Sequence, residues 1–313
     1  MNSLRVLFMG TPEIAARCLS YLAEDGFCIV GAVTGEDKPR GRGNIMTPSP
    51  VKAYALSRDI PVLQPKTLRD ATVAEELAAL QPDVIAVVAY GKILPPDILA
   101  LPRLGAVNLH VSLLPKYRGA APMQRAVMNG ERETGVTVMQ MDAGLDTGDI
   151  LAVARFPLTE ADTFETVHDR SIELGAPLLA EALRALATGT AVPTKQPSEG
   201  ASYAAKIEKA ECRLDFCDSA VRLSAKIRGL SPIPTAHCLH RGKLLKILYA
   251  VAVDGVGAAG EVIAVDAAGE GSITVACGEG ALLIKTLIPE GKGRMSAGDF
   301  VRGRKIEKGD ILS

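Results

Sequence analysis

The chain alternates short, mostly apolar runs with longer stretches in which apolar residues recur every three or four positions. The short runs are rich in β-branched residues, which is typical of strands buried on both faces of a parallel sheet. In the first half, strands are predicted at residues 4–9, 27–34, 60–63, 83–89 and 106–109, and helices at 13–24, 51–58 and 70–80. Parallel neighbours need crossover helices, which this spacing supplies. The pattern therefore predicts an α/β domain with helices on both faces of its sheet.

The pattern changes further along the chain. Residues 163–187 have the apolar spacing of a long helix, although Gly175 and Pro177 inside it permit a kink or a break. Loop-forming residues follow at 189–202. After residue 209 come a short helix at 219–229 and strands separated by glycines at 243–253, 260–265, 272–277 and 281–287. We therefore predict a first domain at 1–188, a linker at 189–208 and a small C-terminal β-barrel domain at 209–313.

Three polar side chains are predicted to converge at one edge of the first sheet. Asn108 and His110 lie two residues apart at the end of a strand, so they point to the same face. Asp146 lies in the turn after the next strand, predicted at 135–141. Ligands of open α/β sheets bind outside the carboxyl ends of the strands, where these side chains fall. Such a group is suited to stabilising an oxyanion and moving a proton at an acyl carbon.

Each member of this group has a predicted role. Asn108 and His110 can both donate a hydrogen bond to a carbonyl oxygen that becomes negative. Asp146 can hold His110 in its charged form, because a nearby carboxylate raises the pKa of an imidazole, or it can relay a proton through water. Direct transfer needs no nucleophile, and Ser112 lacks a GxSxG elbow. The structural alternative is that His110 only stabilises a strand end while Asp142 and Asp146 shape a glycine-rich turn.

Two glycine-containing segments in the first domain are candidate binding loops. The turn after the first strand contains Gly10 but no second or third glycine, so it lacks the GxGxxG pattern of nicotinamide-binding domains. We interpret it as a plain strand–helix turn. The polar insertion at 35–50 carries Lys38, Arg40 and Arg42 among glycines. It fits either a solvated loop or a flexible basic finger that binds nucleic-acid phosphates.

Composition narrows the classes of protein further. The 313 residues are 48% hydrophobic and 23% charged, with a mean hydropathy of +0.18, and no segment is apolar for long enough to span a membrane. The net charge of −1 excludes a strongly basic coat, although residues 209–313 contain fifteen Lys and Arg against twelve Asp and Glu. Six cysteines and four histidines show no disulfide or metal-ligand spacing. We therefore expect reduced thiols, no metal, a cytoplasmic location and a monomer.

A longer signature carries more information than any of these features. NLHVSLLPKYRGAAP, followed by ETGVTVMQMDAGLDTGD, resembles the signature of the folate-dependent formyltransferases. The segments FMGTPEIAAR, GRGNIMTPSPVK, VVAYGKILP and PRLGAVNLH extend the resemblance over much of the chain. The resemblance implies a Rossmann-like formyltransferase domain and an OB-like barrel that contacts tRNA. It also implies an enzyme that transfers a formyl group from 10-formyltetrahydrofolate to the amino group of initiator methionyl-tRNA, for translation initiation.

The resemblance further implies roles for individual residues. The catalytic Asn, His and Asp of the family match Asn108, His110 and Asp146. The segment that contacts the folate matches Ser112, Leu113, Leu114 and Pro115. The basic loop that binds the acceptor end of the tRNA points to Arg42, with Lys38 and Arg40 as further candidates.

The chain departs from the family pattern at two places, and other functions stay open. Val111 stands where glycine is common, and Ser-Pro-Ile-Pro at 231–234 stands where many members have NPWP. A formyltransferase for a small-molecule acceptor, such as glycinamide ribonucleotide or an amino-sugar nucleotide, is the nearest alternative. The barrel argues against the first acceptor, and the basic insertion argues against both. The joint presence of Asn108, His110 and Asp146 argues against a non-catalytic RNA-binding or scaffold protein, and the missing glycine fingerprint argues against a nicotinamide oxidoreductase.

Overall fold

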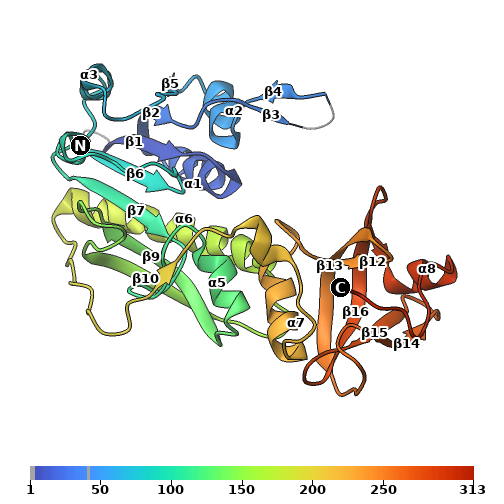
Figure 1. Ribbon diagram of the computed structural model, residues 1–313. Helices are drawn as coiled ribbons and strands as arrows, with labels where there is room; N and C mark the ends of the chain where they lie inside the picture. Colours follow the sequence, from blue (N-terminus) through green and yellow to red (C-terminus); the bar gives the residue numbers. More distant parts are fainter. Residues whose placement is uncertain (1–3, 41–42) are drawn as a thin grey trace. The chain divides into compact units, whose positions relative to one another are not determined.

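The computed structural model describes residues 4–40 and 43–313, and the chain folds as two compact units, most of whose elements are labelled in Figure 1. The first unit consists of Met1–Ala120, Gly135–Phe156 and His168–Ala204, and the second of Ala121–Thr134, Pro157–Val167 and Ala205–Ser313. The units are therefore interleaved along the chain, and the expected boundaries at residues 188 and 209 stay a prediction. In the described part of the chain, no helix is long and apolar enough to cross a membrane.

A seven-stranded sheet lies at the centre of the first unit, in the order β10-β9-β7-β6-β1-β2-β5 (Figure 1). The strands are β1 (Arg5–Gly10), β2 (Cys28–Val33), β5 (Val62–Leu63), β6 (Val84–Val88), β7 (Ala106–His110), β9 (Glu133–Gln140) and β10 (Ile150–Pro157). From β5 to β7 all neighbours are parallel, as predicted, whereas β9 pairs antiparallel with β7. The strand β10 was not predicted, although its first five residues, ILAVA at 150–154, are all apolar.

Helices cover both faces of this sheet, which confirms the predicted α/β arrangement. They are α1 (Glu13–Glu24), α2 (Pro50–Ser57), α3 (Ala71–Ala79), α4 (Pro96–Leu99) and α6 (Phe164–Thr188). Val6 and Phe8 of β1 belong to a core shared with α1, α2 and α6, while Leu7 and Met9 belong to a core shared with α3 and α4. All four side chains are fully buried. A strand covered on both faces reads as a continuous apolar run for this reason.

The predicted helices of the first unit lie within one residue of their expected ends. The helix α2 begins after Ser49 and α3 begins after Asp70, and the side chain of each cap accepts a hydrogen bond from a backbone N–H of the first turn. The helix α6 continues through Pro177 without a break. Local patterning and capping therefore account for these elements.

The insertion at 35–50 contains an antiparallel hairpin. Its strands are β3 (Lys38–Arg40) and β4 (Ile45–Thr47). The Ser49 hydroxyl lies 2.7 Å from the hydroxyl of Thr34, and both residues are buried. The two ends of the insertion are thus joined by a buried hydrogen bond, and its described residues include a strand pairing that neither interpretation of the segment predicted.

A second set of contacts holds the base of this hairpin. Lys52 Nζ donates to the carboxylate of Asp37 at 2.7 Å and to the amide oxygen of Gln64 at 2.8 Å. The Gln64 amide nitrogen donates in turn to Asp37 at 2.9 Å and to the carbonyl oxygen of Gly35 at 2.7 Å. The hydrogen bond from Lys52 is the main cause that lowers the pKa of Asp37. These contacts fix the direction in which the hairpin leaves the sheet.

The second unit is built on an antiparallel sheet in the order β12-β13-β16-β15-β14, with β17 paired to β16 (Figure 1). Its strands are β12 (Ala236–His240), β13 (Lys243–Val253), β14 (Val262–Asp266), β15 (Ser272–Ala276), β16 (Ala281–Pro289) and β17 (Met295–Ser296). Its helices are α5 (Pro122–Met128), α7 (Ala220–Gly229), α8 (Ala297–Arg302) and a 3₁₀ turn at Lys209–Cys212. Leu223 and Ile227 of α7 enter the core of this sheet, whereas Ile233, in the segment that replaces the NPWP motif, is 66% exposed.

The path of this second sheet is open between β12 and β14, and the segment 310–313 connects the two edges. Leu312 forms an antiparallel bridge with His240 of β12, and Ile311 forms one with Glu261 beside β14. Backbone hydrogen bonds support both contacts, including two between Ser313 and Leu239 at 2.6 and 3.0 Å. The predicted small C-terminal β domain is therefore confirmed as an antiparallel sheet, and its closure into a barrel stays a prediction.

Candidate active site

The carboxyl ends of β1, β6 and β7 lie at one edge of the first sheet, since these strands are parallel neighbours. Gly10 of β1 is paired with Val88 of β6, and Val87 of β6 is paired with Asn108 of β7. A Cβ at Gly10 would lie 2.5 Å from the Cβ of Ala15 and 2.7 Å from the carbonyl oxygen of Val88. This close packing of α1 on the sheet explains the glycine, in line with the strand–helix turn that we predicted.

The three predicted polar side chains meet at this edge. The Asn108 amide nitrogen donates to Oδ1 of Asp146 at 3.4 Å, and Nδ1 of His110 lies 3.6 Å from Oδ2. The backbone N–H of Gly119 also donates to Oδ2, at 2.8 Å. The His110 side chain is 5% exposed and that of Asp146 is 14% exposed. The structure therefore brings the three groups together, while their catalytic roles stay a prediction.

Hydrogen bonding indicates where the His110 ring carries its protons. Nε2 lies 2.9 Å from the carbonyl oxygen of Tyr117, and a carbonyl only accepts, so Nε2 is the donor. Nδ1, which faces Asp146, is therefore the position at which the ring gains or loses a proton. Burial lowers the pKa of His110, and the Asp146 carboxylate and the Tyr117 carbonyl oppose this only in part. Desolvation thus acts against the predicted charged form of His110, and the part that Asp146 plays, as a charge partner or as a proton relay, stays a prediction.

The two carboxylates of the site turn differ in what they contact. Asp142 accepts hydrogen bonds from the backbone N–H of Gly144 at 3.0 Å and from the hydroxyl of Thr147 at 2.7 Å. Asp142 therefore stabilises the turn, which is the role that the structural alternative gave to both Asp142 and Asp146. Asp146 has a φ of +53° and directs its carboxylate at Asn108 and His110 instead. Aspartate tolerates this left-handed conformation better than most residues.

The predicted folate-binding residues, Ser112, Leu113, Leu114 and Pro115, follow β7 directly. The Ser112 hydroxyl is fully buried and donates to the carbonyl oxygen of Lys116 at 2.7 Å, so it holds the loop closed. The backbone N–H of Leu114 donates to Thr137, and Leu114 is 8% exposed. Leu113 and Pro115 are half-buried and offer the accessible apolar surface of the four. Folate contact by this segment stays a prediction.

Two of the predicted tRNA-binding residues, Lys38 and Arg40, belong to the hairpin of the first unit. Lys38 is exposed and begins β3, and Arg40 ends the same strand. Arg42, the main candidate, lies outside the residues that the structure describes. The structure therefore places two of the three candidates on one short strand, and their contact with tRNA stays a prediction.

Sequence reasoning missed the groups that hold the site in place. The carbonyl of Tyr117 and the N–H of Gly119 contact His110 and Asp146 through the backbone, so their residue types carry no signal beyond their position in SLLPKYRG. Gln196 donates to the carbonyl oxygen of Asp146 at 2.9 Å. It lies in the predicted linker, 50 residues away, where no pattern indicated a part in the site.

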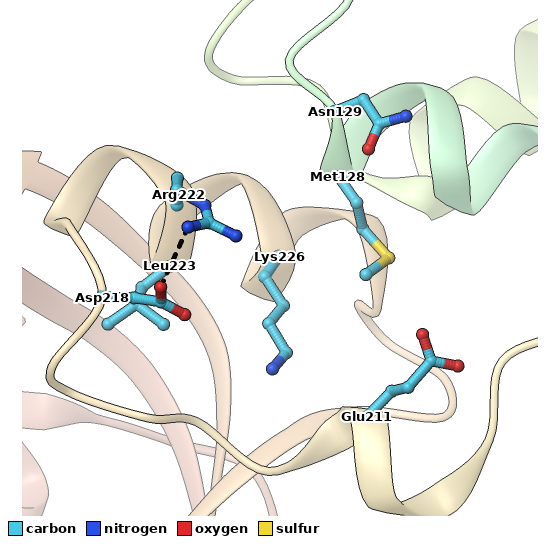
Figure 2. Close-up of a pocket in the computed structure, with 7 residues that line it drawn as sticks. All are labelled: Met128, Asn129, Glu211, Asp218, Arg222, Leu223 and Lys226. Carbon is cyan, nitrogen blue, oxygen red and sulfur yellow. Dashed lines mark ion pairs between the residues drawn. The ribbon is translucent and has the colours of Figure 1, made fainter.

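Figure 2 shows a surface pocket of about 480 Å³ in the second unit, which contains none of the predicted site residues. Its lining consists of Met128, Asn129, Glu211, Asp218, Arg222, Leu223 and Lys226. Arg222 forms an ion pair with Asp218 at 3.1 Å, and Lys226 donates to the carbonyl oxygen of Arg213 at 2.7 Å. Two positive and two negative side chains cancel within the lining, so it provides no net charge that would select an anionic ligand. In the described ranges, no group of three or more His, Cys, Asp or Glu is arranged to hold a metal ion.

Comparison with known families decides what kind of protein carries this site. A family model described as formyl transferase matches residues 4–183, and one described as formyl transferase, C-terminal domain, matches residues 206–305. The chain belongs to the formyl transferase family. The first match includes every residue of the Asn108, His110 and Asp146 group, so the site lies in the part that the family shares.

Curated relatives of this formyl transferase match it over almost its full length. A protein of Citrifermentans bemidjiense named methionyl-tRNA formyltransferase is 44% identical over 312 residues, which cover 100% of this chain and 97% of the relative. A protein of Myxococcus xanthus with the same name is 48% identical over 309 residues, which cover 99% and 98%. The predicted enzyme class is therefore confirmed.

A solved structure extends the likeness to the fold. An N-formyltransferase from Helicobacter canadensis, solved with folinic acid and dTDP-3-aminofucose, superimposes with a TM-score of 0.67 at 20% identity. The match covers 90% of this chain and 98% of that structure. At this identity the likeness supports the shared fold, a Rossmann-like domain followed by a second β domain, and says nothing of the acceptor.

Proposed function

We propose that this formyl transferase moves a formyl group from 10-formyltetrahydrofolate to the amino group of initiator methionyl-tRNA, which gives formylmethionyl-tRNA for translation initiation. Relatives with the name methionyl-tRNA formyltransferase, 44% and 48% identical along almost the whole chain, support this acceptor. The observation that carries the chemistry is the Asp146 carboxylate, which joins Asn108 and His110 at one edge of the sheet. A reaction on initiator tRNA belongs where translation begins, so we place the enzyme in the cytoplasm, acting as a monomer.

The side chains at this edge fit an acyl donor. The second N–H of the Asn108 amide has no hydrogen-bond partner among residues 4–40 and 43–313, so it can donate to a carbonyl oxygen that becomes negative. The two hydrogen-bonding positions of the His110 ring already face Tyr117 and Asp146. We therefore assign the oxyanion contact to Asn108 first, and give His110 a part in proton transfer. Bound folate would supply the formyl group and accept a proton on the nitrogen that leaves.

Proton movement falls to the pair formed by His110 and Asp146. Attack by the amine forms a carbon–nitrogen bond, breaks the bond to the leaving nitrogen, and requires one proton to pass from the first nitrogen to the second. Burial lowers the pKa of His110, which favours the neutral ring, and its Nδ1 faces the Asp146 carboxylate. This pair can take up one proton and return it, either directly or through a water molecule. No covalent enzyme intermediate is needed.

Substrate binding is assigned to the loops on either side of this pair. Leu113 and Pro115 offer half-buried apolar surface beside the site, which suits the ring system of a folate. Lys38 and Arg40 of β3, together with Arg42 close by in the sequence, provide positive charge, which suits the phosphates of an acceptor stem. The base of that hairpin is held by Lys52, so its direction is set before tRNA binds.

The test is a formylation assay with the purified protein, 10-formyltetrahydrofolate and methionine-charged initiator tRNA. We expect transfer to the charged initiator tRNA, and none to the same tRNA without methionine. Glycinamide ribonucleotide and an amino-sugar nucleotide, tested with the same donor, provide the alternatives. Faster transfer to either small molecule would refute the proposed acceptor, and no transfer from this donor to any of the three would refute the proposed function.

A further inference from the structure

The predicted linker runs along both loops that carry the site. Ile150 and Thr194 form an antiparallel bridge, with N–H to carbonyl distances of 2.7 and 2.9 Å. In this register, Gln196 lies opposite Gly148. Further on, β11 (Tyr203–Ala204) pairs with β8 (Arg118–Gly119). The segment 194–204 therefore supports the Asp146 turn on one side and the SLLPKYRG loop on the other.

Gln196 uses both polar atoms of its side chain in this support. Its amide nitrogen donates to the carbonyl oxygens of Asp146 at 2.9 Å and Gly148 at 2.7 Å. Its amide oxygen accepts from Nε and Nη2 of Arg118 at 3.2 and 2.7 Å. Rotation of the amide by a half-turn would place oxygen against two carbonyls and nitrogen against two donors. Only one orientation is compatible with these neighbours, so Arg118 fixes the direction in which Gln196 donates.

The backbone that Gln196 holds needs such support. Asp146 has a φ of +53°, a conformation that costs free energy in a residue other than glycine and persists where the surroundings enforce it. A Cβ at Gly148 would lie 1.7 Å from the carbonyl oxygen of Gln140, so the turn presses closely on the end of β9. The direction of the Asp146 carboxylate depends on the backbone of this turn, and Gln196 binds that backbone on both sides of Thr147.

We propose that Gln196, oriented by Arg118, is a positioning residue that aims the Asp146 carboxylate at Asn108 and His110. The inference rests on the proposed function, because positioning matters for the rate only if this group performs the transfer. Gln196 contacts none of the reacting atoms, and it acts through the carbonyl oxygens of Asp146 and Gly148. The predicted linker then contributes to the geometry of the site and also connects two parts of the chain.

The experiment compares Gln196→Met with Ser198→Met. Methionine has nearly the length of glutamine, carries no charge and donates no hydrogen bond, so Q196M removes the support without changing the net charge. Ser198 is exposed in the same segment and outside the site, so S198M introduces the same side chain as a control. Arg118→Met is a second variant, which leaves the Gln196 donors in place but frees their orientation. It keeps the inference testable if Q196M does not fold.

Two readouts separate positioning from a general structural role. We expect Q196M and R118M to lower kcat by about 10- to 100-fold with little change in KM for either substrate, because displacing a reacting group by about 1 Å has effects of this size. We also expect the pKa of His110, followed by NMR, to fall in Q196M as the carboxylate moves away from Nδ1. The four histidines of the chain make that titration resolvable.

The outcomes distinguish this inference from the proposed function. A kcat in Q196M equal to that of S198M would overturn the inference, as would an unchanged pKa of His110. A parallel rise in KM for both substrates with an unchanged kcat would also overturn it, since that pattern reports weaker binding. If the wild-type protein transfers no formyl group, the proposed function fails, while the NMR titration still tests whether Gln196 places the carboxylate beside His110.

Discussion

Replacing Asp146 by Asn tests the centre of the site, because the change removes a charge and almost no volume. Both carboxylate oxygens accept hydrogen bonds, Oδ1 from Asn108 at 3.4 Å and Oδ2 from the N–H of Gly119 at 2.8 Å. An asparagine has one acceptor oxygen, so its amide nitrogen must face one of these donors. The negative charge 3.6 Å from Nδ1 of His110 is lost as well. The variant therefore keeps the shape of the site and loses its proton acceptor.

The expected effect on the rate is large. A positioned acid or base contributes about 10²- to 10⁴-fold to a rate, so we expect kcat of D146N to fall by about that factor. KM for the folate should change little, since Asp146 is not among the apolar residues assigned to the folate. The assay is single-turnover formylation of methionine-charged initiator tRNA, with circular dichroism of each protein as the control for folding.

The same substitution changes how stability depends on pH. Burial lowers the pKa of His110 in the folded protein, so the unfolded chain binds its proton more readily. The free energy of unfolding then decreases as pH falls below about 6.5, the pKa of histidine in the unfolded chain. The decrease approaches about 1.4 kcal/mol per pH unit and ends once pH falls below the pKa of His110 in the folded protein. Asp146 opposes the lowering, so the folded pKa lies lower in D146N and the loss continues to lower pH.

Urea unfolding of the first unit between about pH 7 and pH 5 measures this difference. We expect the free energies of unfolding of wild type and D146N to diverge as pH falls, with D146N the less stable. Parallel curves would show that the Asp146 charge does not act on His110. A folded D146N protein with the wild-type kcat would remove Asp146 from the proton pathway.

Three further predictions test the surroundings of this pair. Asn108→Ala should lower kcat by about 10²- to 10³-fold, the effect of losing one oxyanion donor, and a wild-type kcat would move that role elsewhere. Gly148→Ala places a Cβ against the carbonyl of Gln140, so the melting temperature should fall by the equivalent of about 1–3 kcal/mol; an unchanged melting temperature would refute the tight packing. Lys52→Met should loosen the hairpin base and raise KM for the tRNA alone, and an equal rise in KM for the folate would contradict the assigned role.

Local patterns in the sequence were sufficient to predict much of the fold. The apolar run of β1 and the spacing of apolar residues in α1 reflect which side chains are buried between the sheet and its helices. The periodicity of apolar residues in the sequence follows these buried faces directly. Capping residues such as Ser49 and Asp70 mark helix starts for an equally local reason. The convergence of Asn108 and His110 followed from strand alternation. It could be predicted because two residues of one strand share a face without reference to any other part of the chain.

What could not be predicted depends on contacts between distant parts of the chain. The lowered pKa of His110 follows from its burial, which no spacing records. The different roles of Asp142 and Asp146 follow from the φ of one residue in an irregular turn. Gln196 reaches the site through a bridge between Thr194 and Ile150 that no periodicity predicts. Each of these features depends on burial, on backbone contacts or on pairing between distant segments. Residue type alone does not determine any of them.

The segment 310–313 has a consequence for how this protein resists self-association. An uncovered edge strand presents unpaired N–H and carbonyl groups, which are a template for pairing with another molecule. Leu312 occupies the edge at β12, and Ile311 pairs beside the edge at β14, so four residues protect two such templates at once. Proteolytic removal of this short segment would therefore leave two edge strands with unpaired backbone groups on one molecule. Because each trimmed molecule could then pair on both sides, the product to expect is an extended aggregate and not a dimer.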